Sequence, residues 1–377
     1  MDALDAACAA AGAGAYVMFA SSEEADLRYL TGFTIHDPVV FIKKRNEPPL
    51  LIVPQMEYAR AVAESSCSVM TRADAGYFEI AKEEPDRWRA LAAMIARVAG
   101  DSYLLPASTP FALGQALAAA GAVHLDSGTV AGMRSIKRPD EIAAIREVQR
   151  RTEAAMALAV GMIARAGVRD GVLMAGDETP LTSAAVRQEM HIALLRSGCR
   201  AADTIISCGE ESAMPHRTGD GPLLAGQPIV IDVFPRSEKT GYYADMSRTV
   251  VKGEPSPEIR EMYAAVGEAK RRAMAAIRPG VAGKELYQMV VDYFAECGYA
   301  SGSSGFVHSL GHGVGLDVHE FPLLGPAGGE LQAGHVVTVE PGLYFPGTGG
   351  VRLEDMGVVT VDGFDPFTRF SEVLVLE

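Results

Sequence analysis

The sequence predicts a chain of two domains, an amino-terminal α/β domain followed by a larger α+β domain. The 377 residues are enough for two to three domains of about 150 residues each. In the first third of the chain, short apolar runs alternate with helical patterns, which is typical of an α/β domain. Further on, the helical patterns are longer, and the turn Ser237–Gly241 joins two strand-like runs as a hairpin. We place the boundary between residues 130 and 131.

The elements of the first domain follow from hydrophobic periodicity. The alanine-rich stretch 6–20 is interrupted by Gly12 and Gly14 and lacks a positively charged start, so we expect a helix, a turn and a strand there and not a secretory signal. The other expected strands are 39–42, 50–53, 103–105 and 123–125, and the expected helices are 88–98 and 111–120.

The second domain begins with the clearest helix of the sequence. Pro139 stands in its first turn, and the two acids that follow Pro139 suit the positive end of a helix. Start and stop signals predict three more helices. The expected helices span about 139–166, 183–197, 257–278 and 284–297, and the expected strands span 228–234, 242–251, 336–339 and 356–361.

Composition excludes several classes of protein. The net charge of −14 opposes binding to nucleic acid or to an anionic membrane surface. No window approaches the run of about 18 apolar residues that a membrane span needs. The five cysteines are scattered and form no C-x-x-C pair, which fits a reducing compartment, so we expect a cytoplasmic protein without a membrane or nucleic-acid partner.

Two aspartates stand in apolar, strand-like contexts. Asp232 lies within Ile229–Phe234, and Asp245 lies across the predicted hairpin. A buried carboxylate without a partner is costly. Two carboxylates on one face of a sheet repel each other unless a cation lies between them. The alternative is that Arg248 pairs with one of them.

Three histidines and two glutamates follow in the second half of this domain. His308, His312 and His319 fall within twelve residues of a glycine-rich stretch, which indicates an extended or looped backbone that another part of the molecule approaches closely. Glu340 and Glu354 each adjoin an apolar run, and Arg352 is the alternative ion-pair partner for either glutamate.

Together these residues predict a site for two divalent cations. Four carboxylates offset the charge of two such ions, and a neutral histidine completes the ligands. A water held between the ions can ionise near neutral pH. The dominance of oxygen ligands and the absence of thiolates favour Mn²⁺ or Co²⁺, with Zn²⁺ able to compete. The predicted ligands are Asp232, Asp245, His312, Glu340 and Glu354.

This set of residues resembles that of the pita-bread metallopeptidases, which include methionine aminopeptidase, aminopeptidase P, Xaa-Pro dipeptidase (prolidase) and the related metal-free creatinase. The matching segments appear in the order of the family, and the resemblance extends over essentially the whole chain. These segments are Asp232 with Gly241–Thr249, His308–Glu320, Val339–Tyr344, Val351–Asp355 and, at the entry to the catalytic domain, Met133–Ile142; Asp26–Phe33 resembles the amino-terminal domain of prolidase, aminopeptidase P and creatinase.

The resemblance implies a pita-bread catalytic domain and a role for each residue. Asp232 would chelate one metal, Asp245 and Glu354 would bridge both, and His312 and Glu340 would complete the second site. Glu340 would also carry the proton to the leaving amine, and His319 would donate a hydrogen bond to the tetrahedral intermediate. His216, His308, His319 and Arg352 match histidines and an arginine that line the pocket of the family.

The resemblance also implies the substrate, with one departure from the family. The amino-terminal domain favours proline-specific members, which cleave the Xaa-Pro bond of di- or oligopeptides as homodimers. Phe234 stands where the family usually has glycine, so we expect this side chain to narrow the pocket or to support Asp232 from behind. We place His216, His308 and Phe234 around the proline ring and Arg352 near the substrate carboxylate. The alternatives are aminopeptidase P activity on longer peptides, a non-catalytic binding module and a creatinase-like hydrolase.

Overall fold

The protein is described here by a computed structural model, which covers residues 3–176, 178–299 and 302–377. The chain divides into two compact units, Met1–Arg134 and Ser135–Glu377. Within the described residues, no helix is both long enough and apolar enough to cross a membrane.

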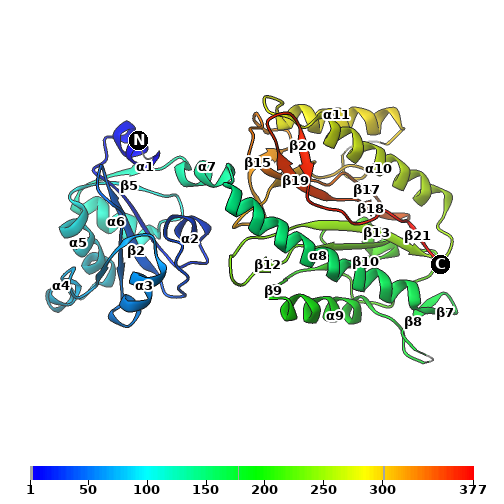
Figure 1. The fold of residues 1–377 in the computed structure, drawn as a ribbon, viewed down its shortest axis with the longest axis horizontal. Coiled ribbons are helices and arrows are strands. Elements are labelled where there is room, and N and C mark those ends of the chain that lie inside the picture. Colours follow the sequence, from blue (N-terminus) through cyan, green and yellow to red (C-terminus); the bar gives the residue numbers. More distant parts are fainter. Residues whose placement is uncertain (1–2, 177, 300–301) are drawn as a thin grey trace. The chain divides into compact units, whose positions relative to one another are not determined.

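The first unit is built on a mixed six-stranded sheet with the strand order β4-β3-β2-β1-β5-β6 (Figure 1). Only β2 is antiparallel to its neighbours, β1 and β3; the remaining pairs are parallel. The α/β class predicted for this part of the chain is confirmed. The strands are β1 (Ala15–Ala20), β2 (Val39–Lys44), β3 (Leu50–Val53), β4 (Ser68–Thr71), β5 (Ser102–Leu105) and β6 (Ala122–Leu125).

Both faces of this sheet are apolar and covered. Along β1, Tyr16 and Met18 belong to one buried cluster, and Ala15 and Val17 belong to the other, as the alternation of a strand requires. The helices of this unit are α1 (Ala3–Ala11), α2 (Ala25–Thr31), the 3₁₀ turn η1 (Gln55–Glu57), α3 (Tyr58–Glu64), α4 (Tyr77–Glu83), α5 (Arg87–Ala99), α6 (Phe111–Ala120) and α7 (Thr129–Ser135).

The helices of the second unit begin where the sequence predicts them. Pro139 is the first residue of α8, and the side chains of Thr182 and Ser256 accept backbone hydrogen bonds at the starts of α9 and α10. These caps satisfy donors that the first helical turn leaves free. The helices are α8 (Pro139–Arg165), α9 (Ser183–Arg196), the 3₁₀ turn η2 (Gly209–Ala213), α10 (Pro257–Ala276) and α11 (Gly283–Glu296).

The strands of the second unit form two larger sheets and three short pairs. The larger sheets have the orders β10-β11-β13-β21 and β15-β14-β16-β19-β20, and the pairs are β12-β9, β17-β18 and β7-β8. The strands are β7 (Gly167–Arg169), β8 (Val172–Met174), β9 (Cys199–Arg200), β10 (Ile205–Cys208), β11 (Ile229–Val233), β12 (Arg236–Ser237), β13 (Met246–Lys252), β14 (Gly311–Gly313), β15 (Glu320–Leu324), β16 (Val336–Val339), β17 (Gly342–Phe345), β18 (Gly349–Arg352), β19 (Asp355–Val359), β20 (Phe364–Pro366) and β21 (Val375–Leu376).

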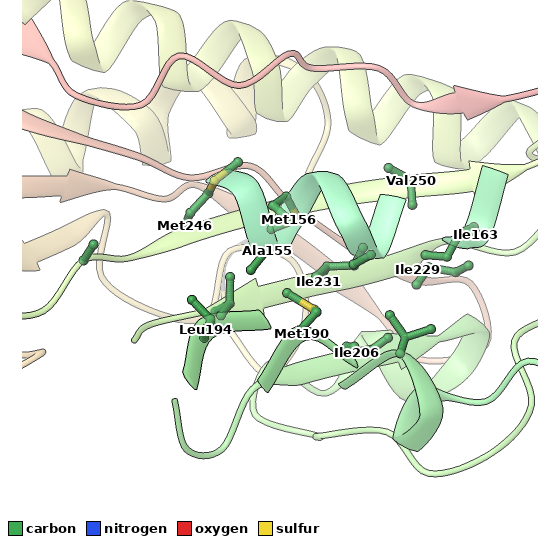
Figure 2. Close-up of a cluster of buried hydrophobic side chains, with 14 of the residues drawn as sticks. Ala155, Met156, Ile163, Met190, Leu194, Ile206, Ile229, Ile231, Met246 and Val250 are labelled. Carbon is green, nitrogen blue, oxygen red and sulfur yellow. The ribbon is translucent and has the colours of Figure 1, made fainter. Parts of the chain in front are cut away.

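One buried cluster fixes the direction of the first candidate ligand. Figure 2 shows Met156 of α8 and Met190 of α9 packed against Ile229 and Ile231 of β11. Because successive side chains of a strand point to opposite faces, Asp232 is turned away from these helices. A second buried cluster joins α10 and α11 to β16, β17 and β18. In Figure 1, α10 and α11 lie on one side of the strands of this unit, and α9 lies on the other.

The predicted hairpin is present but differs in its second strand. β11 and β13 pair antiparallel, with Asp232 opposite Ser247. The strand begins at Met246 and not at Tyr242, because the backbone amides of Tyr243 and Ala244 donate to Gly315 and Pro235, outside the β11–β13 ladder. Asp245 therefore stands at the residue before the strand.

Candidate metal centre

The structure brings the five predicted ligands to one cavity of about 620 Å³. They come from five different places in the second unit: β11, the residue before β13, β14, the residue after β16, and the link between β18 and β19. Each lies within or directly beside a strand, so the sheets fix their backbones. In that order the residues are Asp232, Asp245, His312, Glu340 and Glu354.

Three of the five side chains come close enough to share one ion. One ligand atom each of Asp245, His312 and Glu354 lie within 4.8 Å of one another. His312 Nε2 is also 3.4 Å from Glu340 Oε1 and 3.8 Å from Asp245 Oδ2. The imidazole thus faces two carboxylates and can bind a cation together with them.

The carboxylates fit cations because their buried oxygens lack other partners. Within the part of the chain that the structure describes, Asp232 Oδ1, Asp245 Oδ1 and Glu354 Oε1 are buried and accept no hydrogen bond. Buried polar atoms are nearly always hydrogen-bonded, and leaving a carboxylate oxygen unmatched is costly. Divalent cations are the natural partners of such convergent oxygens.

The electrostatics of the site lead to the same conclusion. Burial first, and neighbouring carboxylates second, raise the pKa of Asp245 and of Glu354 well above the ordinary value. Burial also raises the pKa of Glu340, to about 8. Without cations, therefore, these carboxyls tend to hold protons, and a pair of divalent cations would offset their charge.

His312 is held in the form that binds metals. Burial lowers its pKa to about 3, so the ring is neutral near pH 7. Its Nδ1 lies 3.1 Å from the carbonyl oxygen of Gly313, and a proton on Nδ1 leaves Nε2 free to bind a cation. The predicted close approach to the glycines is confirmed: a Cβ on Gly311 would lie 2.2 Å from the carbonyl oxygen of Thr338.

Arg352 pairs with a different carboxylate from those considered in the sequence. Its Nη2 donates to Asp232 Oδ2 at 2.7 Å, and Glu340 and Glu354 form no ion pair with Arg352 in the described residues. Ser247 accounts for this choice, because Arg352 Nε donates to Ser247 Oγ at 2.9 Å and Ser247 lies opposite Asp232 in the sheet.

Arg248 is likewise occupied elsewhere. It forms an ion pair with Asp355 at 2.8 Å, and Lys270 contacts the other oxygen of the same carboxylate. The alternative to a metal site was that Arg248 neutralises one of the two aspartates. Arg248 pairs with neither Asp232 nor Asp245 in the described residues, so this alternative is wrong. Two consecutive acidic residues therefore point in different directions. Glu354 faces the cavity, and Asp355 faces the positively charged side chains of Arg248 and Lys270.

The residues predicted for the substrate side also line the cavity: His216, Phe234, His308, His319 and Arg352. The rings of His312 and His319 lie 4.2 Å apart at 72°. His308 Nε2 lies 2.9 Å from the hydroxyl of Tyr344, which in turn accepts a hydrogen bond from Arg352 Nη1 at 2.8 Å.

Two residues of this site were missed in the sequence. Tyr344 links His308 to Arg352, and it stands in the segment after Glu340 that carries the family resemblance, although a role was not assigned to it. Asp203 lines the cavity from the loop before β10. Nothing in the sequence near Asp203 distinguishes it from a surface acid.

Models of two protein families match this chain, and so does a relative of similar length. The model of "Metallopeptidase family M24" matches residues 143–361, and that of "Creatinase/Prolidase N-terminal domain" matches residues 1–136. An Xaa-Pro dipeptidase of Lactobacillus delbrueckii subsp. lactis is 32% identical over 94% of this chain and 93% of its own.

Solved structures give the same result. An Xaa-Pro dipeptidase from Bacillus anthracis superposes with a TM-score of 0.85 at 26% identity, over 99% of this chain and 98% of the other. An X-Pro aminopeptidase from Thermotoga maritima gives a TM-score of 0.79 at 26% identity, over 98% of this chain and 99% of the other.

Proposed function

Because the chain belongs to metallopeptidase family M24 and carries a creatinase/prolidase amino-terminal domain, we propose that it is an Xaa-Pro dipeptidase that depends on two divalent metal ions. The observation that carries this proposal is the convergence of four carboxylates and one neutral imidazole on a single cavity, where three buried carboxylate oxygens have no hydrogen-bond partner among the described residues. The relatives named Xaa-Pro dipeptidase support the choice of substrate.

In this proposal the five ligands divide between two cations. Asp232 would hold one ion, Asp245 and Glu354 would contact both, and His312 and Glu340 would complete the second site. When bound, divalent cations polarise a carbonyl group and make water nucleophilic at neutral pH. The oxygen-rich ligand set favours Mn²⁺ or Co²⁺, and Zn²⁺ can compete.

The remaining roles belong to side chains of the cavity wall. Glu340 would move a proton to the leaving amine, and His319 would donate a hydrogen bond to the oxygen of the scissile carbonyl group. His216, His308 and Phe234 pack around the proline ring. Arg352 is held by Asp232, so in our proposal it contacts a substrate carboxylate only when that ion pair opens.

The second candidate function is that of an aminopeptidase P, which acts on longer peptides. The similarity to the Thermotoga maritima X-Pro aminopeptidase supports it, at the same 26% identity as the Bacillus anthracis dipeptidase. A non-catalytic binding module and a creatinase-like hydrolase fit less well, because all five ligands are present. We propose that residues 131–377 carry the reaction and that the enzyme is a cytoplasmic homodimer.

Hydrolysis of Ala-Pro and of Ala-Pro-Ala by the full chain, with Mn²⁺ added, tests the proposal. A dipeptidase cleaves Ala-Pro with the higher kcat/KM, whereas an aminopeptidase P prefers Ala-Pro-Ala. The matched control is Glu354→Gln, which removes one bridging carboxylate and should abolish both activities. Failure of the metal-loaded wild type to cleave either peptide would contradict the proposal.

A further inference from the structure

Asp203 is a carboxylate of the cavity wall that the proposed reaction does not use. It lines the same cavity as the five candidate ligands, and its side chain is exposed. In the described ranges 3–176, 178–299 and 302–377, Asp203 forms neither a hydrogen bond nor an ion pair. Its charge is therefore available to a molecule that enters the cavity.

The sheet register places the loop of Asp203 on the side of the cavity that carries Phe234. Ile205 of β10 pairs directly with Asp232 of β11, and Asp203 precedes Ile205 by two residues, in the loop that leads into β10. Because this pairing is antiparallel, Asp203 and Phe234 lie beyond the same end of the Ile205–Asp232 pair, and both residues line the cavity. A substrate residue next to a proline ring that packs on Phe234 therefore comes near Asp203.

The backbone that carries Asp203 is held firmly. The next residue, Thr204, is fully buried, and its hydroxyl lies 2.9 Å from Nε2 of His191. The carbonyl oxygen of Thr204 accepts a hydrogen bond of 2.9 Å from Nε of Arg187. Asp203 itself has a φ of 53°, a conformation that aspartate and asparagine adopt more readily than most residues. The position of the backbone at Asp203 is therefore set by the fold.

Among the described residues that line the cavity, no positively charged side chain is available to pair with Asp203. The other four carboxylates that line it are the candidate metal ligands, which two divalent cations would neutralise. Arg352 is the only lysine or arginine among the described lining residues, and it is buried in its ion pair with Asp232. Beside Asp203, apolar side chains such as Ile205 and Phe234 complete the wall.

We propose that Asp203 is a specificity residue that favours substrates with an ammonium or guanidinium side chain next to the proline, either before the scissile bond or directly after the proline. This inference rests on the proposed Xaa-Pro hydrolysis and deepens it. The apolar wall holds the stem of a lysine or arginine side chain, and the carboxylate pairs with the charged end. An acidic side chain at the same place is repelled by the carboxylate of Asp203.

Paired peptides of matched shape test the inference with the metal-loaded full chain. Lys-Pro is compared with norleucine-Pro, and Ala-Pro-Lys with Ala-Pro-norleucine, so that each pair differs only in the charged amine. For one of the two pairs we expect kcat/KM to be on the order of three- to five-fold higher for the lysine peptide, the effect of a partly exposed ion pair. The pair that responds identifies the position of the cation.

The variant Asp203→Asn removes the charge and keeps the backbone preference. The ratio within the responding pair should fall to about one in this variant, and in the wild type it should shrink from low to high salt. Asp220→Asn is the matched control, because Asp220 is exposed, close in sequence and absent from the cavity wall. Its ratio should equal that of the wild type.

The outcomes separate this inference from the proposed function. Cleavage of Ala-Pro or Ala-Pro-Ala without any preference for lysine, or with a preference that Asp203→Asn retains, overturns the role of Asp203 and leaves the proposed function intact. Failure to cleave every Xaa-Pro peptide overturns both. A lysine preference that only Asp203→Asn abolishes supports the inference.

Discussion

Replacing Asp245 by asparagine should stabilise the metal-free protein and destabilise the metal-loaded one. Asp245 is buried, and its Oδ1 accepts no hydrogen bond in the described residues, so the change removes charge without breaking a bond to that atom. In the metal-free protein the lost charge relieves repulsion. In the metal-loaded protein the same change removes a ligand that bridges two cations in our proposal.

The magnitude follows from the separation of the carboxylates. A ligand oxygen of Asp245 and one of Glu354 lie within 4.8 Å of each other. Two full charges at that distance repel by about 3.5 kcal/mol at an effective dielectric constant of about 20. Because the carboxyls partly avoid this repulsion by holding protons, we expect a gain of about 2 kcal/mol at pH 9, or about 4 to 8 °C in Tm.

The raised pKa values determine how the stability of the metal-free protein changes with pH. The pKa of Asp245 and that of Glu354 are raised on folding, mainly by burial. A carboxyl of this kind favours the folded state at a pH below its ordinary pKa, and that contribution is lost as the pH rises through the raised value. Burial raises the pKa of Glu340 to about 8, so the metal-free wild type should lose stability between about pH 5 and 9. The gain from Asp245→Asn should therefore be near zero at pH 5.

Thermal unfolding with chelator and with Mn²⁺, at pH 5 and pH 9, measures these differences. The control is Asp355→Asn, because Asp355 is also buried but pairs with Arg248 and Lys270. That variant should lose about 3 to 5 kcal/mol with or without metal, the usual cost of breaking a buried ion pair. A metal-free Asp245→Asn protein that is less stable than wild type at pH 9 would refute the reasoning.

Three further predictions concern the whole enzyme. Chelated protein should lose its activity and regain it best with Mn²⁺ or Co²⁺, as a peptidase assay with verified metal content would show; full activity without metal contradicts the proposed site. The kcat/KM for Ala-Ala should be lower than that for Ala-Pro by the equivalent of about 1 to 3 kcal/mol, the scale of one lost apolar group. Equal kcat/KM values for the two dipeptides would contradict the proposed specificity for proline. Light scattering at micromolar concentration should give the mass of a dimer, and a monomer mass would rule out the homodimer.

Much of the fold could be predicted from local signals. α6 (Phe111–Ala120) has the predicted bounds, and α8 begins at the predicted Pro139, because periodicity and caps are encoded within a few residues. β4 was missed, because Ser68–Thr71 is short and half-exposed, and β14 was missed, because glycine at both of its ends hides the strand pattern. Strands of this kind are specified by their neighbours.

The candidate site shows the same division. The ligands could be predicted because each is a charged or ionisable residue in an unusually apolar or glycine-rich context. The ion pairs could not be predicted. Arg352 pairs directly with Asp232 and also donates a hydrogen bond to Ser247, and these three residues meet only when β18 lies beside β13. Asp203 was likewise invisible, because the pairing of Ile205 with Asp232 is what brings its loop to the cavity.

The arrangement of the two buried clusters in the second unit makes the stability of the folded protein depend on the concentration of the metal ion. Asp232 belongs to a strand backed by α8 and α9, whereas Glu340 follows a strand backed by α10 and α11. The ligands therefore converge only when both clusters have formed, and a cation that binds them selects the fully folded unit. By mass action, an ion at 100 times its dissociation constant would add about 2.7 kcal/mol to the free energy of unfolding. A cell that is short of the ion would hold less folded enzyme as well as less active enzyme.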